Sequence, residues 1–265
     1  GTMKNIFIEG LPGMGKSTLQ RKISAAFPYY RVCREGEYSP VDLAWCAWMT
    51  KEEYDGILEK YGPIREEIRR KTIEEGAHYV VPYTGILTDI PGFHKEMETF
   101  EIYGGRKSLH DLEEIILSRY RKFSRTAHLF ECAFMQNILD ELILFQQVSD
   151  DEILDFYKIL YASINRQDFL LLYLFSDQIE EITEEIKRER VDTRGEEVWY
   201  RLMLSYLVHS PYGQARGYQG WNDLIAHFRH RQEIELRIIR EVVKEQAIVL
   251  PAREWKPEDV LGRCM

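Results

Sequence analysis

NIFIEGLPGMGKS, residues 5–17, is the stretch of sequence from which the fold follows. Its second part, residues 10–17, fits the pattern G-x-x-x-x-G-K-[ST] at every fixed position. Its first part, residues 5–8, is a short apolar run that predicts a buried strand, and a helical pattern starts at Lys16. A glycine-rich loop that joins a buried strand to a helix is the setting in which this pattern binds phosphate.

The glycine-rich loop, residues 10–17, carries the groups that a bound ATP needs. Its glycines allow backbone conformations that side chains forbid, so that successive N–H groups turn toward one anion. Lys16 would bring a positive charge to the β- and γ-phosphates, Ser17 would reach a bound Mg²⁺, and Thr18 would contact the α-phosphate. The alternative is a glycine-rich turn that contains a lysine by chance. The residues predicted to bind the nucleotide are Gly10, Gly13, Met14, Gly15, Lys16, Ser17 and Thr18.

Five short apolar runs alternate with helical patterns along the chain. The runs are residues 5–8, 29–33, 127–130, 169–175 and 247–250. The helical patterns are residues 16–27, 51–75, 109–123, 135–145, 178–190 and 224–243. Strands that alternate with helices form βαβ units, and these build a parallel sheet with helices on both faces. We therefore expect one α/β domain over residues 3–265, in which a helical region at about 36–125 covers the substrate.

The composition excludes several classes of protein. The chain has 265 residues, 45% of them hydrophobic, and a formal net charge of −9, which argues against nucleic-acid binding because that needs a basic face. No apolar run approaches the roughly 18 residues that span a bilayer, and we find no secretion signal. The four cysteines have no paired spacing, which indicates free or buried thiols, and the histidines have no ligand spacing. We expect a cytoplasmic protein that binds neither nucleic acid nor membrane.

An acidic loop follows the second predicted strand. Glu35 and Glu37 lie beside Arg34, and either carboxylate can accept the proton of an attacking hydroxyl group if the loop faces the phosphates. The alternative is a solvated loop with ordinary surface charges. Trp45 and Trp48 follow on an expected helix, where they either stack on a flat substrate or belong to the core.

Glu131 is an acid at the end of the third apolar run. Beside the glycine-rich loop it would hold a magnesium-bound water or an acceptor hydroxyl, and the alternative is a buried acid with a structural partner. Gln136 and Asn137 follow on the next helix, where they either read a polar edge of the substrate or serve as capping or surface residues.

An arginine-rich segment at about 187–197 ends the helix that follows the fourth strand. Arg188, Arg190 and Arg194 would neutralise the charge that develops on the transferred phosphate if the segment closes as a lid. The alternative is a charged helix end, in which Glu184 and Arg188 pair four residues apart.

The order of these features along the chain resembles that of P-loop small-molecule kinases, and thymidylate kinases and deoxynucleoside kinases are closest in layout. The features are the glycine-rich loop, the acidic loop, the acid after the third strand and the arginine-rich lid. The resemblance implies a P-loop NTPase-type three-layer sandwich with a five-stranded parallel sheet and helices on both faces. It also implies that Glu35 or Glu37 is the acid after the second strand and that Glu131 opens an acid-arginine pair. Cys132 stands where the arginine of that pair would be.

These features predict an ATP-dependent enzyme that transfers the γ-phosphate to a small-molecule acceptor. A nucleoside, nucleotide, sugar or antibiotic hydroxyl group is the expected acceptor, and the missing arginine favours one without a phosphate. Ser17 and Glu131 would hold Mg²⁺. The alternative is a nucleotide-binding switch that acts through a partner, and whether the chain forms a homodimer stays open.

Overall fold

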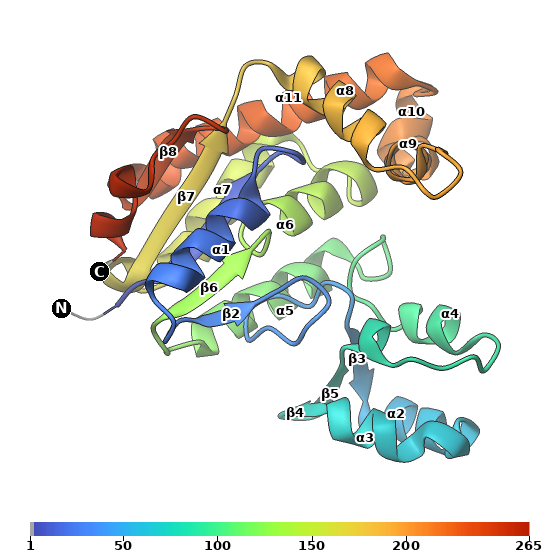
Figure 1. The fold of residues 1–265 in the computed structure, drawn as a ribbon. Coiled ribbons are helices and arrows are strands. Elements are labelled where there is room, and N and C mark those ends of the chain that lie inside the picture. Colours follow the sequence, from blue (N-terminus) through green and yellow to red (C-terminus); the bar gives the residue numbers. More distant parts are fainter. Residues whose placement is uncertain (1–2, 265) are drawn as a thin grey trace. The chain divides into compact units, whose positions relative to one another are not determined.

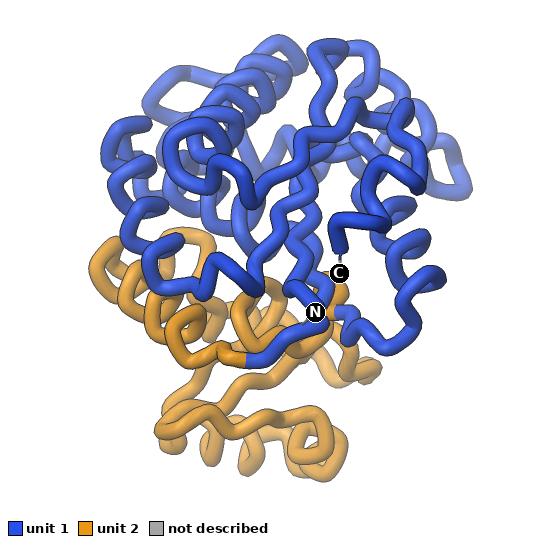
Figure 2. Tube along the Cα trace, turned by 90° about the vertical axis from the view of Figure 1, so that its left-hand side faces the viewer, with its two compact units in different colours: residues 1–32, 125–265 blue, residues 33–124 orange. Residues whose placement is uncertain are grey.

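The computed structural model describes residues 3–264, which form two compact units. One unit joins the described residues up to Val32 with those from Arg125 onward, and the other is Cys33–Ser124 (Figure 2). The second unit has nearly the same bounds as the region that we predict to cover the substrate. Our single-domain prediction stays a prediction, because the compactness of two units does not show whether each folds independently.

The first unit contains the five-stranded parallel sheet that the sequence predicts, flanked by helices (Figure 1). Its strands, in spatial order, are β2 (Arg31–Cys33), β6 (His128–Glu131), β1 (Asn5–Gly10), β7 (Phe169–Phe175) and β8 (Ala247–Pro251). All five predicted strands are present, with bounds that shift by at most two residues. The central strand β1 pairs in parallel with both β6 and β7, so that Ile6 lies beside Leu129 and Leu170.

Both faces of the central strand are buried, which explains its continuous apolar pattern. Side chains alternate along β1, and Phe7 stacks on Phe130 and Phe169 of the two neighbouring strands at ring-centroid distances of 4.8 and 4.9 Å. Helix α1 (Lys16–Ala26) lies across one face of the sheet, and α7 (Asp150–Ala162) and α11 (Trp221–Ile238) lie behind the other (Figure 1).

The other helices of the first unit agree only in part with the predicted patterns. The predicted helices at 135–145 and 224–243 are present, but the last five residues of each widen into a π-helical turn. We did not predict α7, α9 or α10. The helix predicted at 178–190 is confirmed as α8 (Ile179–Glu189). The remaining elements of this unit are α6 (Gln136–Asp140), η3 (Glu141–Phe145), η4 (Arg166–Asp168), α9 (Val198–His209), α10 (Pro211–Arg216), η5 (Ile239–Val243), η6 (Lys244–Gln246), η7 (Pro257–Asp259) and η8 (Leu261–Arg263).

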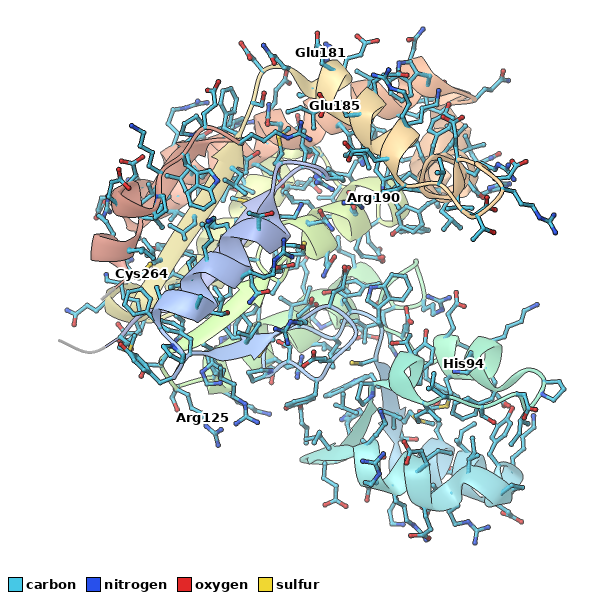
Figure 3. The ribbon with its side chains drawn as sticks, in the orientation of Figure 1. His94, Arg125, Glu181, Glu185, Arg190 and Cys264 are labelled. Carbon is cyan, nitrogen blue, oxygen red and sulfur yellow. The ribbon has the colours of Figure 1, made fainter. Side chains whose placement is uncertain are left out.

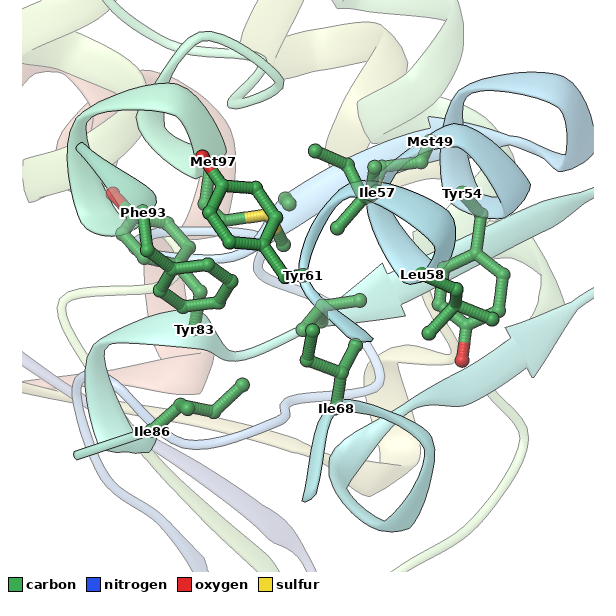
Figure 4. Close-up of a cluster of buried hydrophobic side chains, with 12 residues drawn as sticks. Met49, Tyr54, Ile57, Leu58, Tyr61, Ile68, Tyr83, Ile86, Phe93 and Met97 are labelled. Carbon is green, nitrogen blue, oxygen red and sulfur yellow. The ribbon is translucent and has the colours of Figure 1, made fainter. Parts of the chain in front are cut away.

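We expected a helical region here, but the second unit also contains a three-stranded antiparallel sheet. In spatial order its strands are β3 (Ala47–Thr50), β5 (His78–Val81) and β4 (Ile73–Glu75). Its helices are α2 (Lys51–Lys60), η1 (Gly62–Ile64), α3 (Arg65–Lys71), η2 (Tyr83–Gly85), α4 (Phe93–Glu98) and α5 (Leu109–Lys122). Figure 4 shows its own apolar core, in which Tyr61 meets the ring of Phe93 edge-on at 5.0 Å.

Two predictions in this unit are wrong. The single helix expected at 51–75 ends at Lys60, because Gly62 and Pro63 interrupt the backbone hydrogen bonds of a helix, and residues 73–75 form a strand instead. The helix expected around Trp45 and Trp48 is absent. Trp48 lies in β3, and Trp45 has a left-handed backbone conformation with φ 61°.

The central sheet predicts a large difference between two leucine substitutions. Leu172 on β7 is fully buried between Ile8 and Ile248 of the neighbouring strands, whereas Leu202 on α9 is 67% exposed. We expect Leu172→Ala to lower the free energy of unfolding by about 3–5 kcal/mol. Leu202→Ala should change it by less than about 0.5 kcal/mol. Urea denaturation followed by circular dichroism measures both, and equal shifts would contradict the assigned core.

Candidate functional site

The glycine-rich loop lies between the end of β1 and the start of α1, as the sequence predicts. All three of its motif glycines have positive φ, and two show why a side chain is excluded. Gly15 caps α1 with φ 98°. A Cβ atom on Gly13 would lie 2.1 Å from Cδ1 of Ile186, so that α8 packs directly on the loop. Met14 is buried, and its N–H group donates to the Leu11 carbonyl at 3.3 Å.

The ammonium group of Lys16 is folded back over the start of this loop. Its Nζ atom donates to the carbonyl oxygens of Gly10 at 2.6 Å and Leu11 at 3.1 Å, and to Oε1 of Gln136 at 3.4 Å. Ser17 and Thr18 are exposed on the first turn of α1. The loop therefore presents a lysine, two hydroxyl groups and the N-terminus of an eleven-residue helix in one place.

Glu131 is the last residue of β6 and lies beside Ile8 of β1. Parallel neighbouring strands end at the same edge of the sheet, so that Glu131 and the glycine-rich loop share this edge. Cys132 turns the chain with φ 64° and donates its N–H group to the Ile8 carbonyl at 3.2 Å. The Cys132 side chain is buried, so it does not supply the polar group that an arginine would provide there.

Glu9, which we did not predict as a site residue, ties the central strand to the start of α6. Its carboxylate accepts the N–H groups of Phe134, Met135 and Gln136 at 2.9–3.0 Å. Burial raises the pKa of Glu9 to about 7, although these backbone hydrogen bonds lower it. The signal in the sequence was an acid directly before the glycine-rich loop.

Arg231 on α11 lies fully buried behind the loop. Its guanidinium donates to both oxygens of Asp140 at 3.2 and 3.3 Å, to Oε1 of Gln136 at 3.3 Å and to the Gly10 carbonyl at 3.5 Å. One turn further on, Glu235 accepts a hydrogen bond from the Tyr173 hydroxyl at 2.8 Å. Burial disfavours the charge of Arg231, but Asp140 and Glu235 keep its pKa raised. The signal was two charged residues on the buried face of a helical pattern.

The predicted lid arginines lie at and beyond the end of α8. Arg188 is exposed and pairs with Glu184 at 3.9 Å, which is the structural alternative that the sequence left open. Arg190 lies over the ring of Trp199 at 5.8 Å, and Figure 3 shows it beyond Glu181 and Glu185 on the same helix. Arg194 is exposed in a turn in which Asp192 accepts its N–H group at 2.9 Å.

Another arginine, Arg253, contacts the glycine-rich loop directly. It follows β8 and donates to the Gly13 carbonyl from two nitrogen atoms, at 3.1 and 3.3 Å, and it also pairs with Glu185 of α8. Arg253 follows the last strand and belongs to no sequence motif, so the sequence offered no signal that would identify it.

The two acids of the acidic loop belong to the second unit. Oε1 of Glu35 accepts the indole N–H group of Trp45 at 3.2 Å, and Glu37 lies 3.9 Å from Arg34. Both carboxylates are exposed. Whether either one faces the glycine-rich loop stays a prediction, because the two loops lie in different units.

Residues 3–264 contain no cluster of three or more histidine, cysteine, aspartate or glutamate side chains that could hold a metal ion. A magnesium ion bound mainly by nucleotide phosphates and water needs only one or two protein ligands, so this result does not bear on the pair Ser17 and Glu131. None of the helices in this part of the chain combines the length and apolar character that crossing a membrane requires.

The burial of Glu9 predicts a dependence of stability on pH. Its pKa is about 7 in the folded chain and 4.5 in the unfolded chain, so the unfolded chain loses the proton first as pH rises. The contribution of Glu9 to the free energy of unfolding should therefore fall between pH 4.5 and 7, by up to about 3 kcal/mol. Glu9→Gln should remove this contribution. Denaturation of both proteins across this range measures the difference, and parallel pH curves would contradict the assignment.

No protein-family model matches the chain, and no curated protein sequence matches it significantly. What the site can do must therefore be inferred from its own residues and contacts.

Proposed function

We propose that the chain is an ATP-dependent phosphotransferase of the P-loop kinase type, which moves the γ-phosphate to a small-molecule acceptor. The observation that carries the proposal is the glycine-rich loop at the carboxyl end of the central strand. The loop has the full motif, positive φ at Gly10, Gly13 and Gly15, and a lysine at the start of the following helix. Ligands of open α/β sheets bind at this edge.

Each group of the loop has a role in holding ATP. Backbone N–H groups and the N-terminus of α1 would bind phosphate oxygens. Lys16 would release the carbonyl groups of Gly10 and Leu11 and donate to the β- and γ-phosphates instead. Ser17 and Glu131 would hold Mg²⁺, which neutralises phosphate charge when bound, and Thr18 would contact the α-phosphate.

The acceptor side of the proposal depends on the second unit and the lid. Glu35, or Glu37, would orient the acceptor hydroxyl and accept its proton. Arg188, Arg190 and Arg194 would stabilise the charge that develops on the transferred group. Because Cys132 is buried and offers no guanidinium, we favour an acceptor that carries no phosphate, such as a nucleoside, a sugar or an antibiotic hydroxyl group.

The donor site is tested by Lys16→Ala against Lys22→Ala, a change on the exposed face of the same helix. We expect ATP with Mg²⁺ to stabilise the wild-type protein by about 2.7 kcal/mol at 100 times the dissociation constant. Lys16→Ala should weaken ATP binding by roughly 2–4 kcal/mol, because a charged contact to the phosphates is lost, and Lys22→Ala should not. Thermal denaturation and calorimetry measure both. Equal ATP binding by all three proteins would contradict the proposal that the glycine-rich loop binds the phosphates of ATP.

The acceptor role is tested by ADP release in the presence of nucleosides, nucleotides, sugars and aminoglycosides. Loss of a general base lowers the catalytic rate by about 100-fold or more, while ATP affinity stays nearly unchanged. We expect this result for Glu35→Gln or Glu37→Gln, and no effect for Glu52→Gln on the exposed start of α2. Wild-type rates in both loop variants would remove the acidic loop from the mechanism. ATP binding without ADP release for any acceptor would favour a nucleotide-dependent switch.

A further inference from the structure

Two cationic side chains meet at one side-chain oxygen next to the glycine-rich loop. Oε1 of Gln136 accepts a hydrogen bond from Nζ of Lys16 at 3.4 Å and another from the guanidinium of Arg231 at 3.3 Å. Lys16 comes from the loop and Arg231 from α11, whereas Gln136 begins α6. This glutamine therefore links the predicted phosphate-binding lysine to the buried charges behind it.

The contacts determine which way the amide of Gln136 points. An ammonium group and a guanidinium group can only donate hydrogen bonds, so the amide atom that faces both must be the oxygen. The NH2 group of the same amide must then point away from Lys16 and Arg231. No group within residues 3–264 accepts a hydrogen bond from this NH2, and Gln136 is only half-buried.

Hydrogen bonds fix both the backbone of Gln136 and the oxygen of its side chain. Its N–H group donates to the Glu9 carboxylate at 3.0 Å. The guanidinium that contacts its oxygen is in turn fixed by both carboxylate oxygens of Asp140. A side chain anchored in this way presents its NH2 group with little loss of rotamer entropy when a ligand arrives.

We propose that Gln136 binds the γ-phosphate of ATP through its side-chain NH2 group. The inference rests on the proposed function, since it takes Lys16 to be the lysine that reaches the β- and γ-phosphates. Lys16 already contacts the side chain of Gln136, so a phosphate oxygen that Lys16 binds would lie near the same amide, whose NH2 group can donate to an anion once the side chain turns toward it. Gln136 would thus supply a neutral donor in a segment where Cys132 offers no arginine. Gln136 would then act on the donor nucleotide, whereas the sequence left open either a contact to a polar edge of the substrate or a capping or surface role.

The experiment compares the affinities for ATP and ADP, each with Mg²⁺ and without acceptor, in two variants of Gln136. Gln136→Glu keeps an oxygen toward Lys16 and Arg231, and Gln136→Met removes both polar atoms at similar size. The NH2 group is the only feature that both variants lack. Gln167→Glu, in η4 before the amino end of β7, makes the same charge change at the far edge of the sheet.

We expect both Gln136 variants to lose roughly 10- to 100-fold in the ratio of ATP to ADP affinity, which is the effect of one hydrogen bond to a charged group. Gln167→Glu should keep the wild-type ratio. Because Lys16 itself would contact the γ-phosphate, the role of Gln136 is separated from that of Lys16 by adding Gln136→Met to Lys16→Ala. If Gln136 only positions Lys16, the double variant will have the same ratio as Lys16→Ala, and this result overturns the inference. An unchanged ratio in either variant overturns the inference.

The same measurements separate this inference from the proposed function. If the wild-type protein binds ATP and Lys16→Ala does not, but the Gln136 variants keep the wild-type ratio, the donor site stands and only the role of Gln136 is overturned. If wild type and Lys16→Ala bind neither nucleotide at millimolar concentration, both proposals fail. A melting temperature for each variant shows whether a lost affinity reflects lost folding.

Discussion

The position of β1 between β6 and β7 is the constraint on which the rest of the first unit depends. The strands follow the order β2-β6-β1-β7-β8, so that the first strand of the chain is central and its neighbours come from much later in the sequence. The chain leaves β1 for α1 on one face of the sheet, and the residues after β6 lead into α6 toward the other face. Open α/β sheets bind ligands at the carboxyl ends of strands whose connections leave toward opposite faces, and the glycine-rich loop follows the carboxyl end of β1.

This placement brings charged groups into the interior, and their pairing makes the arrangement specific. Glu9 continues β1 inside the sheet, where burial of an unpaired carboxylate would be costly, and three backbone N–H groups of the chain before α6 satisfy it. Arg231 is satisfied chiefly by Asp140. Removing one partner of such a buried pair typically costs about 3–5 kcal/mol, so the glycine-rich loop is supported by groups that cannot easily be exchanged. Arg231 contacts the loop directly at the Gly10 carbonyl, and it contacts Gln136, whose side chain contacts Lys16 of the loop.

The sequence predicted the parallel sheet well and the second unit poorly, for a physical reason. Strands buried on both faces are apolar over most of their length, and β7 accordingly has the predicted bounds, Phe169–Phe175. The strands β3 and β4 are short, half-exposed and antiparallel, and their pattern was read as part of a helix. The charged, amphipathic pattern of residues 51–75 favoured a helix. Residues 73–75 instead pair with β5, and this pairing depends on residues outside the segment from which the helix was predicted.

For the site, the sequence by itself determined the glycine-rich loop, because spacing and backbone freedom are local properties that residues 10–17 carry alone. It also placed Glu131 at the end of a strand, and the order of the strands then set it beside that loop. Only the tertiary structure decided that Glu9, Arg231 and Arg253 contact the groups around the loop, since these contacts join residues more than a hundred positions apart. Tertiary packing also oriented Gln136, because the direction of an amide depends on the donors that surround it and not on its neighbours in the chain.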